Sequence, residues 1–78
     1  MNTEQKIISM VAEQFGLDEN TLTRDTSFED DIEADSLDVI ELTMAVEDIF
    51  KLSEISDDDL KQITTIGHLV DYVEKATE

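Results

Sequence analysis

The sequence predicts an all-α domain with four helices, the third of them short. Proline is absent and glycine occurs twice, a composition that favours helices joined by polar loops. Apolar residues recur at helical spacing along much of the chain, and polar caps bound the periodic stretches. With 40% hydrophobic residues, the chain is too apolar to be a disordered acidic tail. We therefore expect residues 1–78 to form one small domain, held together by apolar helix faces because it has no cysteine to cross-link it.

The first helix is predicted over Thr3 to Phe15. Asn2 precedes it as a cap, and Gly16 follows it as a stop because glycine readily adopts the left-handed conformation at a helix end. Between Asp18 and Asp35 the helical pattern breaks, and a connection of this length is usually functional or contains turns of its own. Three apolar residues are the expected anchors of this region to the core, namely Leu17, Leu22 and Phe28.

The second helix, predicted from Ser36 to Phe50 or Lys51, has two apolar faces. At 100° per residue, one face is an ordinary core stripe, made of Val39, Leu42, Thr43, Val46, Ile49 and Phe50. The other face mixes apolar and acidic residues and begins at the serine: Ser36, Leu37, Ile40, Glu41, Met44, Glu47 and Asp48. Apolar residues ringed by carboxylates are typical of a recognition surface, and burial of the helix on two sides of a bundle is the alternative.

A short third helix is predicted after Ser56, because the acidic run Asp57 to Asp59 suits the positive end of a helix. Thr64 or Thr65 caps the fourth helix, which ends near Ala76. The expected core contacts of these two helices are Leu60 and Ile63 from the third, and Ile66, Leu69, Val70 and Val73, bordered by Tyr72, from the fourth.

The net charge of the chain is −16, from 21 acidic and five basic residues. This charge repels nucleic-acid phosphates and anionic membrane surfaces, so we expect neither as a partner. Proteins with basic patches are the expected partners, with association that weakens as salt rises. The chain lacks the pattern of a secretory signal and any run near the roughly 20 apolar residues of a membrane span, so a cytoplasmic location is expected.

No residue pattern points to catalysis or to a metal site. His68 is the single histidine, and neither a nucleophile elbow nor an oxyanion glycine pattern accompanies it. The acidic loop fails as a calcium-binding EF-hand, because Ser36 and Leu42 stand where that motif needs glycine and glutamate. We therefore expect neither an enzyme nor a dedicated metal site.

Ser36 is the candidate for covalent modification. A serine at the start of a helix is most often a cap. A phosphodiester on its hydroxyl would nevertheless be favoured there, because the helix N-terminus offers free N–H groups and a positive dipole end. The sequence places no base nearby to activate the hydroxyl, so another enzyme would have to make the modification. A chain without catalytic groups can still take part in covalent chemistry through an attached reactive group.

The stretch Ala34-Asp35-Ser36-Leu37-Asp38, followed by Ile40-Glu41-Leu42 and Met44-Ala45-Val46-Glu47, closely resembles the acyl carrier protein family. The resemblance extends over essentially the whole chain, including Ser27-Phe28 and Ile63-Thr64-Thr65-Ile66. It implies a four-helix bundle with a short third helix, in a single acyl carrier domain that acts as a monomer.

The function that this resemblance implies is that of a thioester carrier. Ser36, flanked by Asp35, Leu37 and Asp38, would carry 4′-phosphopantetheine, donated by coenzyme A through a phosphopantetheinyl transferase of the holo-acyl-carrier-protein-synthase type. The thiol of that arm would present acyl groups to the acyl-transferring and chain-extending enzymes of fatty-acid or polyketide-type biosynthesis. An aminoacyl or peptidyl carrier, and an unmodified adaptor that serves protein interaction alone, remain as alternatives.

The resemblance also implies a docking face and an acyl-chain pocket. The docking residues are Leu37, Ile40, Glu41, Met44, Glu47 and Asp48, the same face that periodicity separates from the core stripe. The pocket residues are Phe28, Val39, Leu42, Val46, Ile63, Leu69 and Tyr72. Two features depart from the common family pattern. Glu33 stands where many bacterial members have glycine, and the loop after Phe50 is longer than usual and lacks a frequent proline.

Overall fold

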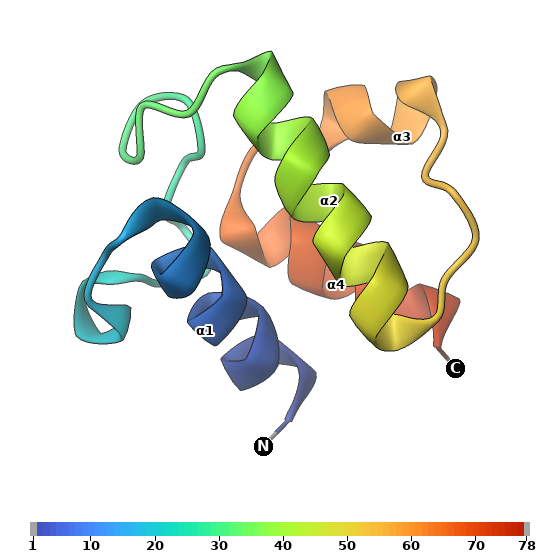
Figure 1. The fold of residues 1–78 in the computed structure, drawn as a ribbon, viewed down its shortest axis with the longest axis horizontal. Coiled ribbons are helices and arrows are strands. Elements are labelled where there is room, and N and C mark those ends of the chain that lie inside the picture. The colour runs from blue at the N-terminus through green and yellow to red at the C-terminus, as the bar shows by residue number, and fades with distance from the viewer. Residues whose placement is uncertain (1, 78) are drawn as a thin grey trace.

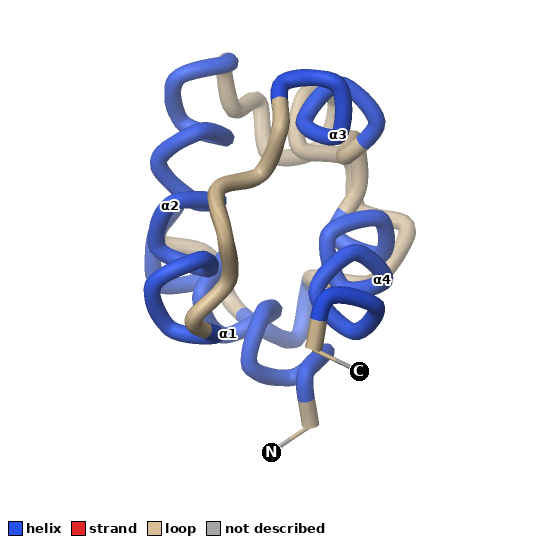
Figure 2. The backbone as a smooth tube through the Cα atoms, turned by 90° about the vertical axis from the view of Figure 1, so that its right-hand side faces the viewer, coloured by secondary structure: helices blue, strands red, loops and turns tan. Residues whose placement is uncertain are grey.

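A computed structural model describes residues 2–77, which form the four expected helices. α1 spans Thr3–Phe15, α2 spans Ser36–Phe50, α3 spans Asp57–Gln62 and α4 spans Ile66–Ala76, with a 3₁₀ turn, η1, at Glu19–Thr21. α1 packs against both α2 and α4 (Figure 1). Figure 2 shows the loop after α2 running back to reach the short α3. The described residues contain no strand, and the all-α prediction is confirmed.

Short-range capping sets the helix ends where the sequence predicts them. The side chains of Asn2, Ser56 and Thr65 each accept the backbone N–H three residues further on, at the starts of α1, α3 and α4. Gly16 ends α1 with a φ of 67°, in the left-handed region. Between the two threonines that could cap α4, Thr65 is the cap. None of the helices in residues 2–77 is long and apolar enough to cross a bilayer.

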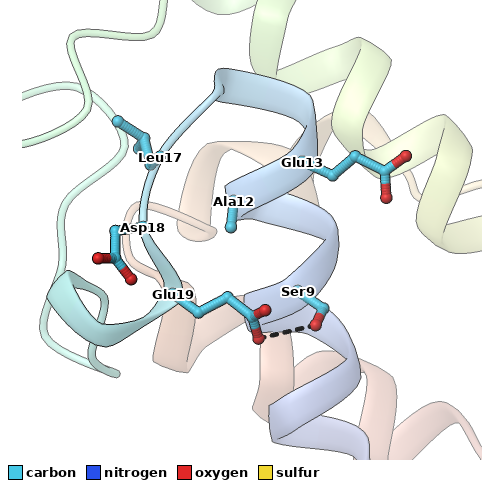
Figure 3. A pocket seen from close by; sticks show the side chains of 6 residues that line it. All are labelled: Ser9, Ala12, Glu13, Leu17, Asp18 and Glu19. Carbon is cyan, nitrogen blue, oxygen red and sulfur yellow. Dashed lines mark hydrogen bonds between the residues drawn. The ribbon is translucent and has the colours of Figure 1, made fainter.

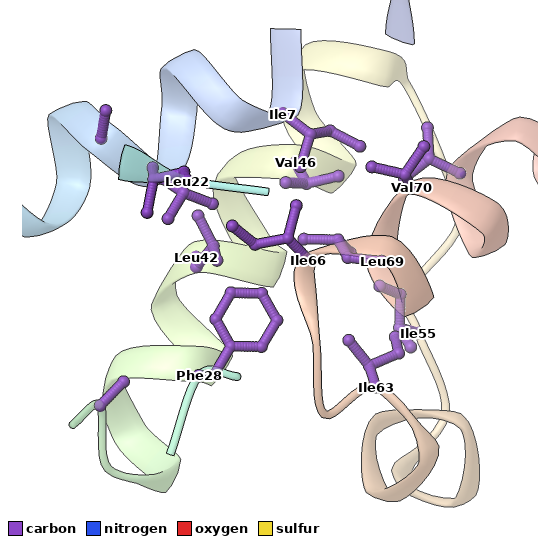
Figure 4. Close-up of a cluster of buried hydrophobic side chains, with 14 residues drawn as sticks. Ile7, Leu22, Phe28, Leu42, Val46, Ile55, Ile63, Ile66, Leu69 and Val70 are labelled. Carbon is purple, nitrogen blue, oxygen red and sulfur yellow. The ribbon is translucent and has the colours of Figure 1, made fainter. Parts of the chain in front are cut away.

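The core contains side chains from α1, α2 and α4, together with residues of the loops before and after α2 (Figure 4). Phe28, from the first loop, is 2% exposed and belongs to the same cluster as Leu42 of α2 and Leu69 of α4. Leu22 is also buried, so two of the three expected loop anchors are confirmed. The buried hydrophobic residues are Ile7, Val11, Ala12, Leu22, Phe28, Ala34, Leu42, Val46, Ile55, Ile63, Ile66, Leu69, Val70 and Val73.

Two residues expected in the core are exposed instead. The N–H of Leu17 closes the α1 terminus on the carbonyl oxygen of Ala12, but the Leu17 side chain stays at the surface and is 38% exposed. Ile49 is 57% exposed although it has the right angle on α2. At this end of the helix it is Phe50 and Leu52 that pack against the core. Helical angle alone therefore placed Ile49 wrongly, since it does not say how far the neighbouring elements extend.

The first loop binds the start of α4 through backbone hydrogen bonds. The N–H of Phe28 donates to the carbonyl of Thr64 at 3.0 Å, and the N–H of Ile66 donates to the carbonyl of Thr26 at 3.0 Å. These bonds surround an isolated bridge between Ser27 and Thr65. The first N–H groups of a helix have no acceptor within it, so the loop satisfies donors that α4 cannot. The first loop therefore stabilises the start of α4 as well as connecting α1 to α2. We call this contact of the first loop with the start of α4 the clasp.

Arg24 fastens this loop to two helices. One guanidinium nitrogen lies 3.0 Å from a carboxylate oxygen of Glu4 in α1, and another lies 2.6 Å from one of Asp71 in α4. Hydrogen bonds to Asp71, and then to Glu4, raise the pKa of the Arg24 guanidinium above its ordinary value. Arg24 therefore remains charged, and it offsets part of the repulsion between the acidic side chains of α1 and α4.

Candidate functional site

Ser36 is the first residue of α2, and its side chain is exposed. The cap of the helix is Asp35: its carboxylate accepts the N–H of Asp38 at 2.9 Å, and the Asp38 carboxylate accepts the N–H of Asp35 at 3.2 Å. The interpretation of Ser36 as a cap is therefore wrong. The acid-x-x-acid spacing around Ser36 could have indicated this reciprocal box. Among residues 2–77, no hydrogen-bond partner occupies the Ser36 hydroxyl.

The start of α2 suits an attached phosphoryl group. The N–H groups of Ser36 and Leu37 lie in the first turn and have no acceptor within the helix, while the Asp35 carboxylate is occupied by Asp38. Free N–H donors and the helix dipole both favour a phosphodiester at this point. The loop before the helix is held by Ala34, which is buried and donates its N–H to the carbonyl of Phe28 at 2.8 Å. The hydroxyl of Ser36 is thus exposed on a well-anchored helix start.

Glu33, three residues before Ser36, has a left-handed backbone with a φ of 61°. Residues other than glycine adopt this conformation at a cost, because Cβ approaches the following carbonyl oxygen. The glycine that many family members have at this position would adopt it freely. The departure noted in the sequence therefore has a physical cost: the backbone at Glu33 is left-handed, and a residue with a Cβ is strained there.

The second face of α2 is open to solvent, in contrast to its core stripe. Leu37 is 62% exposed, Met44 60% and Ile40 40%, and Glu41 and Asp48 are also exposed. Burial of α2 on two sides within the chain is therefore excluded for these residues. Because Ser36 begins the same helix, an exposed apolar and acidic strip extends from the candidate attachment point.

Glu47 differs from the rest of this face. Its side chain is half-buried, and its Oε1 accepts the N–H of Ile55 at 3.0 Å, from the loop between α2 and α3. The sequence offers no signal for this bond, because it joins residues eight positions apart across an irregular loop. Glu47 thus has a role within the fold in addition to its place among the predicted docking residues.

The residues expected to line an acyl-chain pocket are brought together as packed core. Phe28, Leu42, Val46, Ile63 and Leu69 are buried in one cluster (Figure 4). Val39 and Tyr72 are half-buried and pack against it. Two surface hollows lie elsewhere. One, of about 430 Å³, lies between α1 and the turn after it, where the Ser9 hydroxyl donates to Glu19 at 2.8 Å (Figure 3). The other, of about 500 Å³, is lined by Met44, Glu47, Asp48, Lys51 and Leu52.

His68 is engaged in the clasp at α4. Its Nδ1 accepts the backbone N–H of Thr64 at 3.2 Å, so the imidazole helps to close the first turn of the helix. This arrangement gives the ring a structural partner on the residue just before the Thr65 cap. Within residues 2–77, no group of three or more histidine, cysteine or carboxylate side chains is arranged to hold a metal ion.

Comparisons with known proteins agree with this geometry. The family model described as "Phosphopantetheine attachment site" matches residues 5–73. The chain is also similar to the solved structure of the acyl carrier protein from Enterococcus faecalis, with 34% sequence identity and a TM-score of 0.80. That match covers 95% of this chain and 92% of the other. The fold, the motif and both comparisons lead to one conclusion: the chain belongs to the acyl carrier protein family, whose members have a phosphopantetheine attachment site.

Proposed function

We propose that this protein is an acyl carrier protein of fatty-acid or polyketide-type biosynthesis, with 4′-phosphopantetheine attached to Ser36. The observation that carries the proposal is the exposed Ser36 hydroxyl at a helix start whose cap is supplied by Asp35. The attached arm supplies a thiol on which acyl groups are held as thioesters. The chain itself positions the attachment point, provides free N–H groups for the phosphate and offers a surface to the enzymes that act on the cargo.

The proposed partners are a phosphopantetheinyl transferase and acyl-transferring enzymes with basic docking patches, met in the cytoplasm. The exposed strip formed by Leu37, Ile40, Met44 and the acidic residues beside them supports this proposal. Apolar anchors give a docking surface its affinity, and surrounding carboxylates steer a basic partner towards it. For a chain of net charge −16, such steering is fast and depends on salt.

The proposed acyl-chain site is the core between α2 and α4. Its candidate lining residues already form one apolar cluster, which an acyl chain would enter by parting side chains rather than by filling an open cavity. The burial of apolar surface stabilises such an occupant by about 0.8 kcal/mol per methylene. We therefore expect loading with longer chains to raise the melting temperature stepwise.

The modification test uses intact mass. The unaltered chain is incubated with coenzyme A and a phosphopantetheinyl transferase, next to the variants Ser36→Ala and Ser53→Ala. Ser53 is an exposed serine in the loop after α2, so its variant serves as the matched control. We expect the unaltered chain and Ser53→Ala to gain the mass of one arm and Ser36→Ala to gain none. Absence of any gain on the unaltered chain would refute the carrier proposal in favour of an unmodified adaptor.

The docking test reverses one charge. Glu41→Lys should weaken binding of the transferase several-fold while leaving the melting temperature unchanged or higher, because Glu41 is exposed on the strip and its loss relieves repulsion. Glu13→Lys makes the same charge change on α1 and should bind nearly as the unaltered chain does. Equal affinities for both variants would contradict the docking face. The groups loaded onto the holo form then separate a fatty-acyl carrier from an aminoacyl or peptidyl carrier.

A further inference from the structure

Glu33 lies between two residues that the core holds in place. Ile32 packs against the buried cluster, and Ala34 is itself buried. The N–H of Ile32 donates to the carbonyl of Ser27 at 3.1 Å, and the N–H of Ala34 donates to that of Phe28 at 2.8 Å. The backbone on both sides of Glu33 is therefore fixed by the fold, while the Glu33 side chain is exposed.

The glutamate costs the fold stability and makes no bond in return. Its φ of 61° is unfavourable for a residue with a Cβ. Its charge adds to the repulsion within a chain of net charge −16. Among residues 2–77, no hydrogen bond or ion pair uses the Glu33 carboxylate. Residues that weaken a fold without a structural return are concentrated at functional sites.

Lys51 provides a contrast, because it also has a left-handed backbone, with a φ of 56°. It ends α2, and its N–H donates to the carbonyl of Glu47. A left-handed residue is a common way to end a helix, and the helix dipole favours a cation there. Glu33 ends no helix. The conformation of Lys51 is thus explained by the fold, whereas that of Glu33 is not.

Glu33 also supplies a free charge beside Ser36. Three acidic residues lie within three positions of this serine, namely Glu33, Asp35 and Asp38. Asp35 and Asp38 each accept the other's N–H in the capping box, so Glu33 is the member of this group without a bond in the described fold. It lies on the loop before α2, whereas the exposed strip follows the helix after Ser36 (Figure 1).

We propose that Glu33 is a specificity-determining residue for attachment of the arm, recognised by a cationic side chain of the transferase. This proposal rests on the proposed function. In the attachment reaction the Ser36 oxygen forms a bond to a phosphorus of the coenzyme A diphosphate, the nucleotide part leaves with the electrons of the broken P–O bond, and the hydroxyl proton passes to the transferase. The transferase must therefore contact the surface around Ser36. Enzymes that act on the thiol reach only the far end of the arm and do not have to contact this loop.

A carboxylate at position 33 distinguishes this chain from the family members that have glycine there. The acidic strip of α2 attracts basic partners in general, so it does not by itself separate one carrier from another. A charge on a fixed backbone three residues from the reacting hydroxyl does so for the transferase alone. Exposed ion pairs are weak, so the expected effect is a change in rate rather than a loss of activity.

The test measures initial rates of arm attachment over a range of concentrations of each variant, with a transferase that modifies the unaltered chain. Glu33→Gln keeps the Cβ and removes the charge, so we expect kcat/KM to fall about three- to fivefold through KM, with kcat nearly unchanged. Glu29→Gln removes an equal charge from an exposed position in the same loop and should behave as the unaltered chain. The difference between the two variants should shrink as salt rises, which a merely structural role would not produce.

Equal kcat/KM in Glu33→Gln and the unaltered chain, or equal falls in both glutamine variants, would overturn the proposal. Glu33→Gly separates charge from conformation, because it removes the carboxylate together with the strain. We expect its kcat/KM to fall as far as that of Glu33→Gln. A fall in the glycine variant alone would assign the effect to the backbone and overturn recognition of the carboxylate.

Loading of the finished arm is the second measurement. Each variant is converted fully to its holo form with excess transferase and coenzyme A, and is then loaded by an acyltransferase that accepts the unaltered holo form. We expect equal loading rates for the unaltered chain, Glu33→Gln and Glu29→Gln, because this enzyme acts on the thiol. A matching fall in Glu33→Gln at this step would overturn specificity for attachment. An unaltered chain that gains no arm would refute the proposed function and this proposal with it, whereas the other contrary outcomes overturn this proposal alone.

Discussion

The N–H of Gly67 donates to the carbonyl oxygen of Arg24 at 2.8 Å, so the first loop lies directly against the first turn of α4. A Cβ on Gly67 would lie 3.0 Å from that oxygen and 3.2 Å from the Cβ of Arg24. Both separations are tighter than ordinary contact, and one of them is to backbone. The missing side chain of Gly67 is therefore what allows the clasp between loop and helix.

Gly67→Ala should destabilise the protein even though alanine is the better helix former. The added methyl group forces the Arg24 backbone away from α4, and overpacking of this kind costs about 1–3 kcal/mol. Urea unfolding measures the change. Glu74→Ala, an exposed site on the same helix, serves as the control and should change stability by less than about 0.5 kcal/mol. If Gly67→Ala is as stable as the control, the loop adapts and the close approach is not required.

Glu33→Gly should stabilise the protein. The left-handed backbone costs a residue with a Cβ about 1–2 kcal/mol, and glycine removes that cost. Glycine also makes the unfolded chain more flexible, which offsets part of the gain, so we expect a net stabilisation of about 0.5 kcal/mol or more. Glu33→Ala removes the same charge but keeps Cβ, so it separates conformation from electrostatics. Lys51, with a φ of 56°, gives an independent repeat through Lys51→Gly. A gain in Glu33→Ala equal to that in Glu33→Gly would assign the effect to charge.

The helices were predictable because their signals are local. Caps such as Asn2 and Ser56 and the stop at Gly16 act within one turn, and the structure has them where the sequence places them. The motif around Ser36 is likewise contiguous, so the candidate attachment point needed no tertiary information. What local signals cannot convey is the extent of neighbouring elements.

The tertiary contacts that hold the site were not predictable in the same way. The backbone hydrogen bonds between the first loop and α4 leave no side-chain signature apart from a glycine at position 67. The bond from Glu47 to Ile55 depends on the path of an irregular loop. The sequence therefore identified Glu47 by its place on a helix face, but it could not identify the N–H of Ile55 as its hydrogen-bond partner.

Asp35→Ala and Asp35→Asn should separate the two roles of this residue. Alanine removes the cap of α2 and should cost about 1 kcal/mol, whereas asparagine still accepts the N–H of Asp38 and should leave stability nearly unchanged. Both variants lose the same charge beside Ser36. Thermal unfolding measures the first effect, and the initial rate of modification by a transferase measures the second. A slow rate in both variants would indicate that the transferase recognises the negative charge of Asp35. A slow rate in Asp35→Ala alone would indicate that the transferase requires the capped helix.

Leu42→Ala and Ile49→Ala test how α2 lies in the molecule. The two residues have nearly the same angle on the helix, but Leu42 is 1% exposed and Ile49 is 57% exposed. Leu42→Ala should cost about 2–5 kcal/mol, because it removes a buried side chain and leaves a cavity in the cluster. Ile49→Ala should change stability by about 0.5 kcal/mol or less, because water already reaches most of its side chain and alanine favours the helix. Urea unfolding compares them directly. Equal costs would mean that Ile49 is covered in solution, and melting temperatures that rise with protein concentration would then identify a second copy of the chain as the cover.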